Sequence, residues 1–312
     1  MNEITGKILE QVNSVIIGKE AVTEKVLMAV LAQGHVLLED VPGVGKTTMA
    51  LAFARTLGLD SRRVQFTSDT MPSDIIGFSV YNKATGEFDY KSGAVMTNLL
   101  LADEINRTSS KTQSALLEAM EEYQVTVDGR TYPLPVPFVV LATQNPVGSA
   151  GTQLLPSSQL DRFMIRTTMG YPDRKSQVDI LRERHHENPL DRLSGVITCQ
   201  ELLALIDRVR QVHIADEVYD YIVELVGATR DNELIDLGIS PRGALALCRM
   251  AKAHAFVRGR DFVTPEDVYD VFDDVCAHRL VLSAKARLSK LTAMEVTARL
   301  RGEVRVPQVS AL

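Results

Sequence analysis

Short apolar runs alternate with amphipathic stretches along the first half of the chain. Five of these runs predict buried strands, at residues 35–39, 63–67, 98–104, 138–143 and 163–169. Apolar positions at helical spacing predict helices between them, most clearly over residues 111–122. Strands that are apolar on both faces and alternate with helices are typical of a parallel α/β sheet. Residues 1–18 are expected to form a polar lead-in to this region.

Two segments of the same region alternate apolar and polar residues around a turn, and each predicts a hairpin. The first spans Gly77 to Gly93, with its turn at residues 82–86. The second spans residues 125–132 and turns at Asp128-Gly129, a dipeptide that favours a two-residue hairpin turn. We expect the first hairpin to be inserted between elements of the core; a solvated surface hairpin without a role is the alternative.

The pattern is helical throughout the second half of the chain. The change comes at residues 170–173, Gly-Tyr-Pro-Asp, which suit a boundary. Apolar residues then recur at helical spacing near residues 202–209, 218–226 and 244–258. Another helix is expected to start at Thr264-Pro265, because threonine caps helices and proline suits the first helical position. We therefore predict an α/β core over residues 1–171 and an all-α lid over residues 172–312.

The composition narrows the class of protein. The 312 residues are 45% hydrophobic and carry a net charge of −6. This acidic balance argues against a general nucleic-acid binder, which usually has a basic excess. No apolar stretch approaches the ~20 residues of a membrane span, and the polar N-terminus does not resemble a signal peptide.

The cysteines and the paired histidines predict neither a disulfide nor a metal site. The three cysteines, Cys199, Cys248 and Cys276, lie far apart and predict free thiols in a reducing, cytoplasmic compartment. His185-His186 has no further ligand at a recognisable spacing, so we interpret the pair as a solvated helix end.

The loop after the first predicted strand carries the most informative motif. Residues 41–48 read Val-Pro-Gly-Val-Gly-Lys-Thr-Thr between a strand and a helix, which is the order of a nucleotide-binding P-loop. The predicted phosphate-binding residues are Pro42, Gly43, Val44, Gly45, Lys46, Thr47 and Thr48. Gly43 and Gly45 permit a tight turn that aims backbone N–H groups at phosphate oxygens, and the following helix N-terminus adds partial positive charge.

Two side chains of this loop have specific tasks, and one position departs from the motif. Lys46 is expected to reach the β- and γ-phosphates, while Thr47 offers its hydroxyl to Mg²⁺. The motif expects glycine at position 40, where this chain has Asp40. A carboxylate beside phosphates is unfavourable unless it points away from them.

Polar side chains end two further predicted strands. Asp103 and Glu104 follow the third apolar run, and Asn145 follows the fourth. Because the carboxyl ends of parallel strands face the ligand, these side chains are expected near the phosphates. Asp103 would hold Mg²⁺, Glu104 would act as general base on the attacking water, and Asn145 would orient that water. Taken alone, Asn145-Pro146 is usually only a turn.

Further motifs follow in a fixed order. They are Phe-Thr-Ser-Asp at 66–69 with Pro-Ser-Asp-Ile at 72–75, Leu-Ala-Asp-Glu-Ile-Asn-Arg at 101–107 continuing into 111–122, Ala-Thr-Gln-Asn-Pro at 142–146, Leu-Asp-Arg-Phe at 160–163 and Ser-Pro-Arg at 240–242. With them the chain resembles the AAA+ ATPases and, more narrowly, the MoxR family. The resemblance covers nearly the whole chain.

The resemblance implies a fold and roles for the matching positions. Lys46 and Thr47 match the Walker A residues, and Asp103 and Glu104 match Walker B. Asn145 matches sensor 1. Arg162 matches the arginine finger that enters a neighbour's site, and Arg242 matches sensor 2 on the lid over the γ-phosphate. Ile17 and Gly18 match a segment near adenine. The two predicted hairpins correspond to the helix-2 insert and the pre-sensor-1 hairpin, which are thought to face the ring pore or a partner in relatives.

The family also implies an activity. It would be a Mg²⁺-dependent ATPase that uses ATP, forms a ring, expected to be a hexamer, and matures a protein complex in a chaperone-like way, often by metal or cofactor insertion. The usual partner is a von Willebrand factor A protein, which holds its metal with Asp-x-Ser-x-Ser. This chain lacks that motif, so such a partner and the client complex would be separate polypeptides.

Two other functions remain as alternatives. A DNA-remodelling motor would need a basic stripe on the hairpins, whose charged residues are instead Lys83, Lys91 and Arg130 against Glu87, Asp89 and Asp128. Nucleic acid is therefore not an expected partner. A nucleotide-switched scaffold without turnover predicts loss of Glu104, Asn145 or Arg162, and all three are present.

Overall fold

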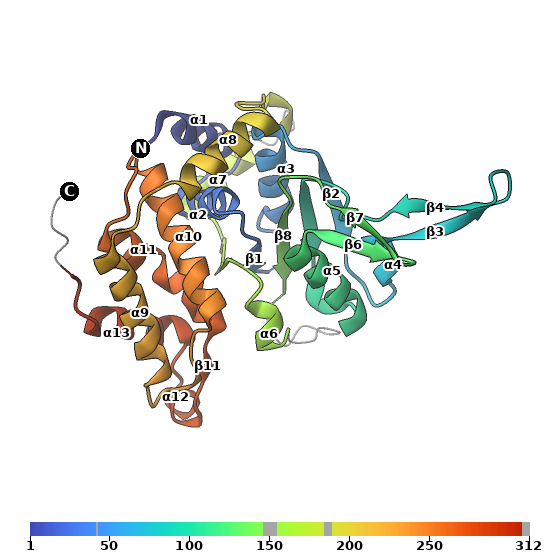
Figure 1. Cartoon of the computed structure of the whole chain (residues 1–312). Helices are drawn as coiled ribbons and strands as arrows, with labels where there is room; N and C mark the ends of the chain where they lie inside the picture. Colours follow the sequence, from blue (N-terminus) through green and yellow to red (C-terminus); the bar gives the residue numbers. More distant parts are fainter. Residues whose placement is uncertain (42, 146–154, 184–188, 308–312) are drawn as a thin grey trace.

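The computed structural model describes residues 1–41, 43–145, 155–183 and 189–307. An α/β part and a helical part lie side by side (Figure 1). The α/β part is built on a five-stranded parallel sheet in the order β2-β5-β8-β1-β9. Its strands are β1 (Val36–Glu39), β2 (Ser61–Gln65), β5 (Leu99–Asp103), β8 (Val139–Gln144) and β9 (Ile165–Thr167). All five predicted strands are present, so the predicted parallel α/β sheet is confirmed.

The central strands send alternate side chains to two separate cores. Leu99 and Leu101 of β5 pack in the core that also holds helix α3 (Lys46–Thr56). Leu100 and Ala102 pack on the opposite face in the core that holds helix α5 (Ser110–Glu122). Both sets are almost fully buried, which explains why these strands are apolar at every position.

The N-terminal residues form a helix, and the prediction of a polar lead-in over residues 1–18 is wrong. Helix α1 spans Glu3–Asn13, and the side chain of Asn2 caps it by accepting from the N–H of Ile4. Ile8 and Val12 are completely buried. The polar residues that suggested a lead-in occupy the opposite, exposed face of an amphipathic helix.

Both predicted hairpins are present (Figure 1). The first pairs β3 (Gly77–Asn82) with β4 (Glu87–Ser92) and projects away from the body, while the second pairs β6 (Gln124–Val127) with β7 (Arg130–Pro133). Asp128 and Gly129 both have positive φ, as the two-residue turn requires. Tyr90 of β4 stacks on Tyr132 of β7 with ring centroids 4.0 Å apart, which joins the two hairpins at the base of the first.

The C-terminal part is helical, as predicted, with one small exception. Its helices are α7 (Arg174–Glu183), α8 (Cys199–Arg210), α9 (Asp216–Arg230), α10 (Pro241–Val257), α11 (Pro265–Cys276), α12 (Ala284–Leu288) and α13 (Ala293–Glu303). The exception is a two-stranded antiparallel ladder of β10 (Ile235–Leu237) and β11 (Val281–Leu282). The remaining helical elements are α2 (Glu20–Leu31), α4 (Pro72–Ile76), α6 (Ser157–Leu160) and the 3-10 turns η1 (Ile105–Arg107), η2 (Pro189–Arg192) and η3 (Ala277–Arg279).

The N-terminal helices bind the lid as well as the sheet. Lys25 of α2 lies 2.7 Å from the carboxylate of Asp274, and Glu24 lies 2.6 Å from Arg258. Residues 1–31 therefore bridge both parts of the molecule, and the division at residues 171 and 172 stays a prediction. Within the described ranges, no helix is both long and apolar enough to cross a membrane.

Candidate nucleotide site

The P-loop turns where the sequence predicts it. Gly43 and Gly45 have φ angles of +87° and +99°, in the left-handed region that favours glycine. Among the described residues, apart from the chain neighbours of Gly43, no atom lies within 4 Å of the position that a Cβ on Gly43 would occupy. Helix α3 begins directly afterwards at Lys46, and its first backbone N–H groups have no helical partner. This geometry suits an anion such as phosphate.

Lys46 lies folded over its own loop. The residue is 8% exposed, and Nζ donates to the carbonyl oxygen of Asp40 at 2.8 Å. Burial lowers the pKa of Lys46, although the nearby carboxylates of Asp40, Asp103 and Glu104 oppose this shift. The hydrogen-bond partners of the ammonium are thus neutral carbonyls, which phosphate oxygens can replace at a gain in electrostatic energy.

The carboxylate of Asp40, which stands where the motif expects glycine, binds backbone N–H groups outside the P-loop. One oxygen of its carboxylate accepts from the backbone N–H of Met169, and the other accepts from Gly170 N–H at 3.0 Å. The residue is 7% exposed. The charge is therefore satisfied by the segment that leads from β9 into the lid, and Asp40 ties the end of β1 to that segment.

The two acids meet different partners at the end of β5. Asp103 Oδ2 accepts from Arg63 Nε at 2.7 Å, and Oδ1 accepts from Thr143 Oγ1 at 3.2 Å. Glu104 adopts a left-handed conformation with φ +58°, held by a hydrogen bond from its N–H to Thr143 Oγ1 at 2.8 Å. Thr143, on the neighbouring strand β8, thus binds the carboxylate of Asp103 and the backbone of Glu104.

Glu104 accepts three side-chain hydrogen bonds. Asn145 Nδ2 lies 2.9 Å from Oε1, while Gln65 Nε2 and Arg107 Nη1 each lie 2.8 Å from Oε2. Burial pushes the pKa of Glu104 upward, but the hydrogen bonds from Arg107 and Asn145 outweigh burial and lower the pKa below its ordinary value. Glu104 is therefore ionised at neutral pH and can accept a proton.

Asn145 has an unused acceptor in this site. Its side chain donates to Glu104, and its backbone N–H and carbonyl pair with Asn106 at 3.3 and 3.2 Å. Its Oδ1 is buried without a hydrogen-bond partner among the described residues. A buried, unpaired amide oxygen next to a carboxylate suits a water molecule held between them.

The residues present fit Mg²⁺ bound together with phosphates. Thr47 stands in the first turn of α3, and Asp103 ends β5 on the same edge of the sheet. Hydroxyl and carboxylate oxygens are ligands that Mg²⁺ accepts, usually one or two from the protein with phosphates and waters completing the shell. In the described ranges, no group of three His, Cys, Asp or Glu side chains could hold a metal by itself. The pair His185-His186, which the sequence predicts to be a solvated helix end, lies outside the described residues.

The segment predicted near adenine lies at the junction with the lid. Gly18 has φ +72°, and a Cβ on it would lie 2.2 Å from Ser176 Oγ of α7, so only glycine fits this approach. Ile17 beside it is half-buried, and Lys19 Nζ donates to the carbonyl of Tyr171 at 2.9 Å. Val44 packs against the core, while Pro42 lies outside the described residues.

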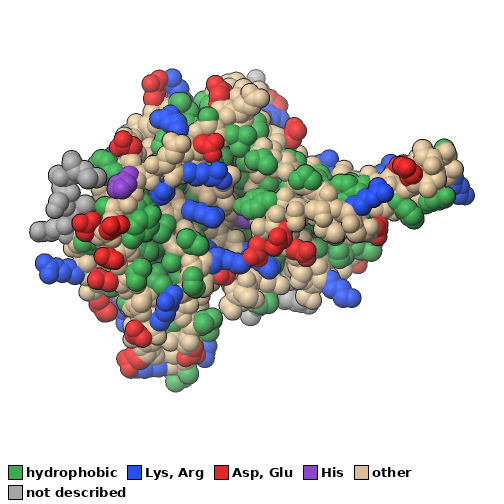
Figure 2. Space-filling view, viewed as in Figure 1, with side chains coloured by type: hydrophobic (Ala, Val, Ile, Leu, Met, Phe, Trp, Pro, Cys, Tyr) green, Lys and Arg blue, Asp and Glu red, His purple; other side chains and the backbone are tan. Residues whose placement is uncertain are grey.

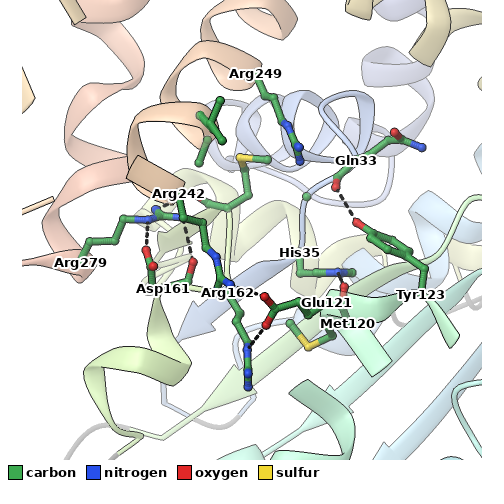
Figure 3. Close-up of a pocket in the computed structure, with 14 residues that line it drawn as sticks. Gln33, His35, Met120, Glu121, Tyr123, Asp161, Arg162, Arg242, Arg249 and Arg279 are labelled. Carbon is green, nitrogen blue, oxygen red and sulfur yellow. Dashed lines mark hydrogen bonds and ion pairs between the residues drawn. The ribbon is translucent and has the colours of Figure 1, made fainter. Parts of the chain in front are cut away.

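Arg162 and Arg242 lie together in a second cluster. Arg162 Nε donates to Glu121 Oε2 at 2.8 Å, and Arg242 binds the other oxygen of the same carboxylate (Figure 3). They line a cavity of about 400 Å³ with Arg249 and Arg279, where Lys and Arg side chains gather between the two parts of the molecule (Figure 2). The P-loop lysine Lys46 does not line this cavity.

Several contributors to these clusters were not predicted as site residues. Arg63 and Gln65 come from β2 and Arg279 from η3, while Glu121 lies in the last turn of α5, inside a motif that gave it no role. The sequence offered one signal, polar residues near the end of β2, beside the strand that bears the acids. The other contacts join residues far apart in the chain.

The fold and the site define a P-loop nucleotide-binding protein with a helical lid. The model of the ATPase family associated with various cellular activities (AAA) matches residues 35–165, and the AAA lid domain model matches residues 227–300. A crystal structure of a protein from Cytophaga hutchinsonii, assigned as an ATPase, has a TM-score of 0.90 at 37% identity and covers 98% of this chain and 95% of its own.

Two sequence relatives narrow the class. "Uncharacterized protein YeaC" from Bacillus subtilis is 46% identical over 307 residues, which span 98% of this chain and 96% of the relative. "Chaperone MoxR1" from Mycobacterium tuberculosis is 40% identical over 311 residues, which span 97% of this chain and 82% of the relative. The chain belongs to the MoxR family of AAA+ ATPases, as its motifs predict.

The structure generates a prediction about Asp40. Replacing it by glycine, as the motif would have it, removes the acceptor for two backbone N–H groups at the lid junction. We expect D40G to lose about 1–3 kcal/mol of the free energy of unfolding in urea denaturation, without gaining ATP affinity. D40N, which keeps one acceptor oxygen, should lose less. Tighter ATP binding by D40G at unchanged stability would show that the carboxylate acts on the phosphates.

Proposed function

We propose that the protein is a cytoplasmic, Mg²⁺-dependent ATPase that assembles into a ring and changes the conformation of a client protein complex. The observation that carries this proposal is the contact of Glu104 with Asn145 beside the P-loop, 2.9 Å from oxygen to nitrogen. An ionised carboxylate beside an amide oxygen without a partner among the described residues suits a water molecule that attacks a phosphate bound by the P-loop. This arrangement supports hydrolysis rather than nucleotide-controlled scaffolding alone.

Each residue of the site has a chemical task in this proposal. The backbone of the P-loop and Lys46 bind the phosphates and spread their negative charge. Mg²⁺, when bound with ATP, would be held by Thr47 and Asp103 and would neutralise charge that develops between the phosphates. Glu104 takes the proton of the attacking water, and Asn145 orients that water.

The site is completed, in this proposal, by a neighbouring protomer. Arg162 and Arg242 meet at Glu121 and line a cavity whose lining includes no P-loop residue. One chain thus presents a phosphate-binding half and an arginine half at two different places. Two such halves join when each protomer offers its arginines to the next one, a heterologous contact that closes into a ring. We propose a hexamer in which both arginines act across the interface on the γ-phosphate.

The first hairpin is the proposed contact with the client. Phe78, Tyr81 and Phe88 are 51%, 53% and 60% exposed, and apolar side chains lie along this arm (Figure 2). The rings of Tyr81 and Phe88 meet at 5.4 Å without further cover. Exposed aromatic residues on a projecting element typically mark a protein contact. We propose a von Willebrand factor A protein as partner, and metal or cofactor insertion as the outcome.

The first experiment tests hydrolysis. E104Q keeps the size of the side chain but removes the base, so ATP turnover should fall about 10²–10⁴-fold while ATP still binds. E118Q is the matched control, because Glu118 lies on the exposed face of α5. Turnover is measured by phosphate release, and binding by fluorescent nucleotide titration. Normal turnover in E104Q would remove Glu104 from the catalytic role.

The second experiment tests the shared site. R162A and K46A should each be inactive, and a mixture of the two should regain part of the ATPase activity, because some interfaces then combine an intact P-loop with an intact arginine. A finger of this kind contributes about 10³–10⁵-fold in related phosphoryl transfers. R242A is expected to behave as R162A does. No recovery in proteins shown to co-assemble would contradict an action across the interface.

The third experiment identifies the client. E104Q is held with ATP and used as bait in native lysate, with K46A as the control that binds nucleotide poorly. We expect mass spectrometry to find a von Willebrand factor A protein or a subunit of a metalloenzyme enriched on E104Q. Enrichment of DNA or of replication proteins would instead support a DNA-remodelling motor, a function that the mixed charges of the hairpins do not favour.

A further inference from the structure

The segment that carries Arg162 is held in place from the lid. Arg279, in η3, buries its side chain to 2% exposure and reaches into residues 161–164. Its guanidinium donates to Asp161 Oδ1 at 2.8 Å, to the carbonyl of Phe163 at 2.6 Å and to the carbonyl of Met164 at 3.1 Å. These acceptors lie on both sides of Arg162 in the chain.

Every nitrogen of this guanidinium is occupied. Nε binds the carboxylate of Asp161, Nη2 lies between the carbonyls of Asp161 and Phe163, and Nη1 binds the carbonyls of Met164 and Val275. A planar fork with five N–H groups can satisfy such a set of acceptors, whereas a lysine ammonium cannot. Arg279 therefore has no donor left for a substrate, and its effect must pass through the segment that it holds.

The same carboxylate also reaches the helix that bears Arg242. Asp161 Oδ2 accepts from Ser240 Oγ at 3.1 Å, while Oδ1 accepts from Arg279. Ser240 is the N-cap residue of α10, and Arg242 stands in the first turn of that helix. Asp161 thus links the segment of Arg162 to both lid elements. Figure 3 shows the contact between Asp161 and Arg279 beside the one at Glu121.

We propose that Arg279 is a positioning residue for the arginine half of the site. It fixes the backbone around Arg162 and, through Asp161 and Ser240, sets the distance between Arg162 and Arg242, so that the lid and the arginine finger move as one body. This inference rests on the proposed function, in which Arg162 acts on the nucleotide of the next protomer.

The burial of the ion pair between Arg279 and Asp161 is not explained well by a gain in the free energy of folding. Taking a guanidinium and a carboxylate out of water costs about as much as their attraction returns, and apolar residues of the same volume often stabilise a protein equally. A buried arginine that binds three backbone carbonyls around the partly buried Arg162 instead fixes geometry. Phosphoryl transfer depends on such geometry, because a displacement of about 1 Å in a reacting group costs roughly 10²-fold in rate.

R279K in the full-length chain tests the proposal. Lysine keeps the charge but cannot bind all the carbonyls, so ATPase activity should fall about 10²-fold while ATP affinity stays unchanged. R301K is the matched control: Arg301 is also a largely buried lid arginine, paired with Asp273 at 3.0 Å, but it does not contact residues 161–164. R301K should keep its activity.

Mixing experiments separate positioning from a general loss of structure. R279K should regain activity with K46A but not with R162A, because R279K and R162A damage the same half of the site. Recovery with R162A would overturn the proposal, as would wild-type activity of R279K alone. If R162A and K46A fail to recover each other, the proposed function falls and this inference with it. Recovery of that pair beside a fully active R279K overturns the inference alone.

Hydrogen exchange gives a readout that does not depend on activity. The N–H groups of Phe163 and Met164 donate to Leu160 and His35 at 3.1 and 2.7 Å. Their exchange should speed up at least tenfold in R279K and remain unchanged in R301K. If R279K does not fold, D161N replaces it, because it removes the counter-charge at constant size and should show the same pattern to a smaller degree. Unchanged exchange of these amides in a folded variant would overturn the proposal.

Discussion

The order of the strands is the constraint on which the whole site depends. β8 lies between β1, which leads into the P-loop, and β5, which ends in the two acids. Ala142 pairs with Ala102 and Thr143 pairs with Leu38, so the polar end of β8 must lie between Lys46 and the acids. Thr143 and Asn145 can then bind the carboxylates from one side. A shift of one residue in this pairing would turn each side chain to the other face of the sheet.

The charges of the two clusters suit the proposed site shared between protomers. The P-loop cluster sets Lys46 and Arg63 beside the three carboxylates of Asp40, Asp103 and Glu104, so its own side chains do not give it a strong positive charge. The arginine half has the opposite charge balance, with an excess of positive charge, because Arg162 and Arg242 share the single carboxylate of Glu121. Two guanidinium groups on one carboxylate leave a surplus of positive charge, which is what an incoming γ-phosphate requires.

Features formed by residues close together in the sequence could be predicted. Contacts between residues far apart in the sequence could not. The P-loop and the adjacent acids are local motifs, and the buried strands are apolar at every position, so each could be predicted from a short window. Glu121 lies 41 residues from Arg162 and 121 from Arg242, and such contacts leave no periodicity. Helix α1 was missed although Ile4, Ile8 and Val12 stand at helical spacing, because the polar residues of its exposed face outnumber them.

Two carboxylates attach the lid at opposite ends of the edge strand β9. Asp161, before this strand, binds Ser240 and Arg279 of the lid, while Asp40 binds the backbone of the segment that follows the strand. The carbonyl of Asp40 also accepts from Lys46 at 2.8 Å. The residue that departs from the P-loop motif is therefore in contact with both the P-loop lysine and the segment that leads into the lid. A glycine would keep the carbonyl that binds Lys46 but would lose the carboxylate that binds residues 169 and 170, which gives a physical reason for an aspartate at this position.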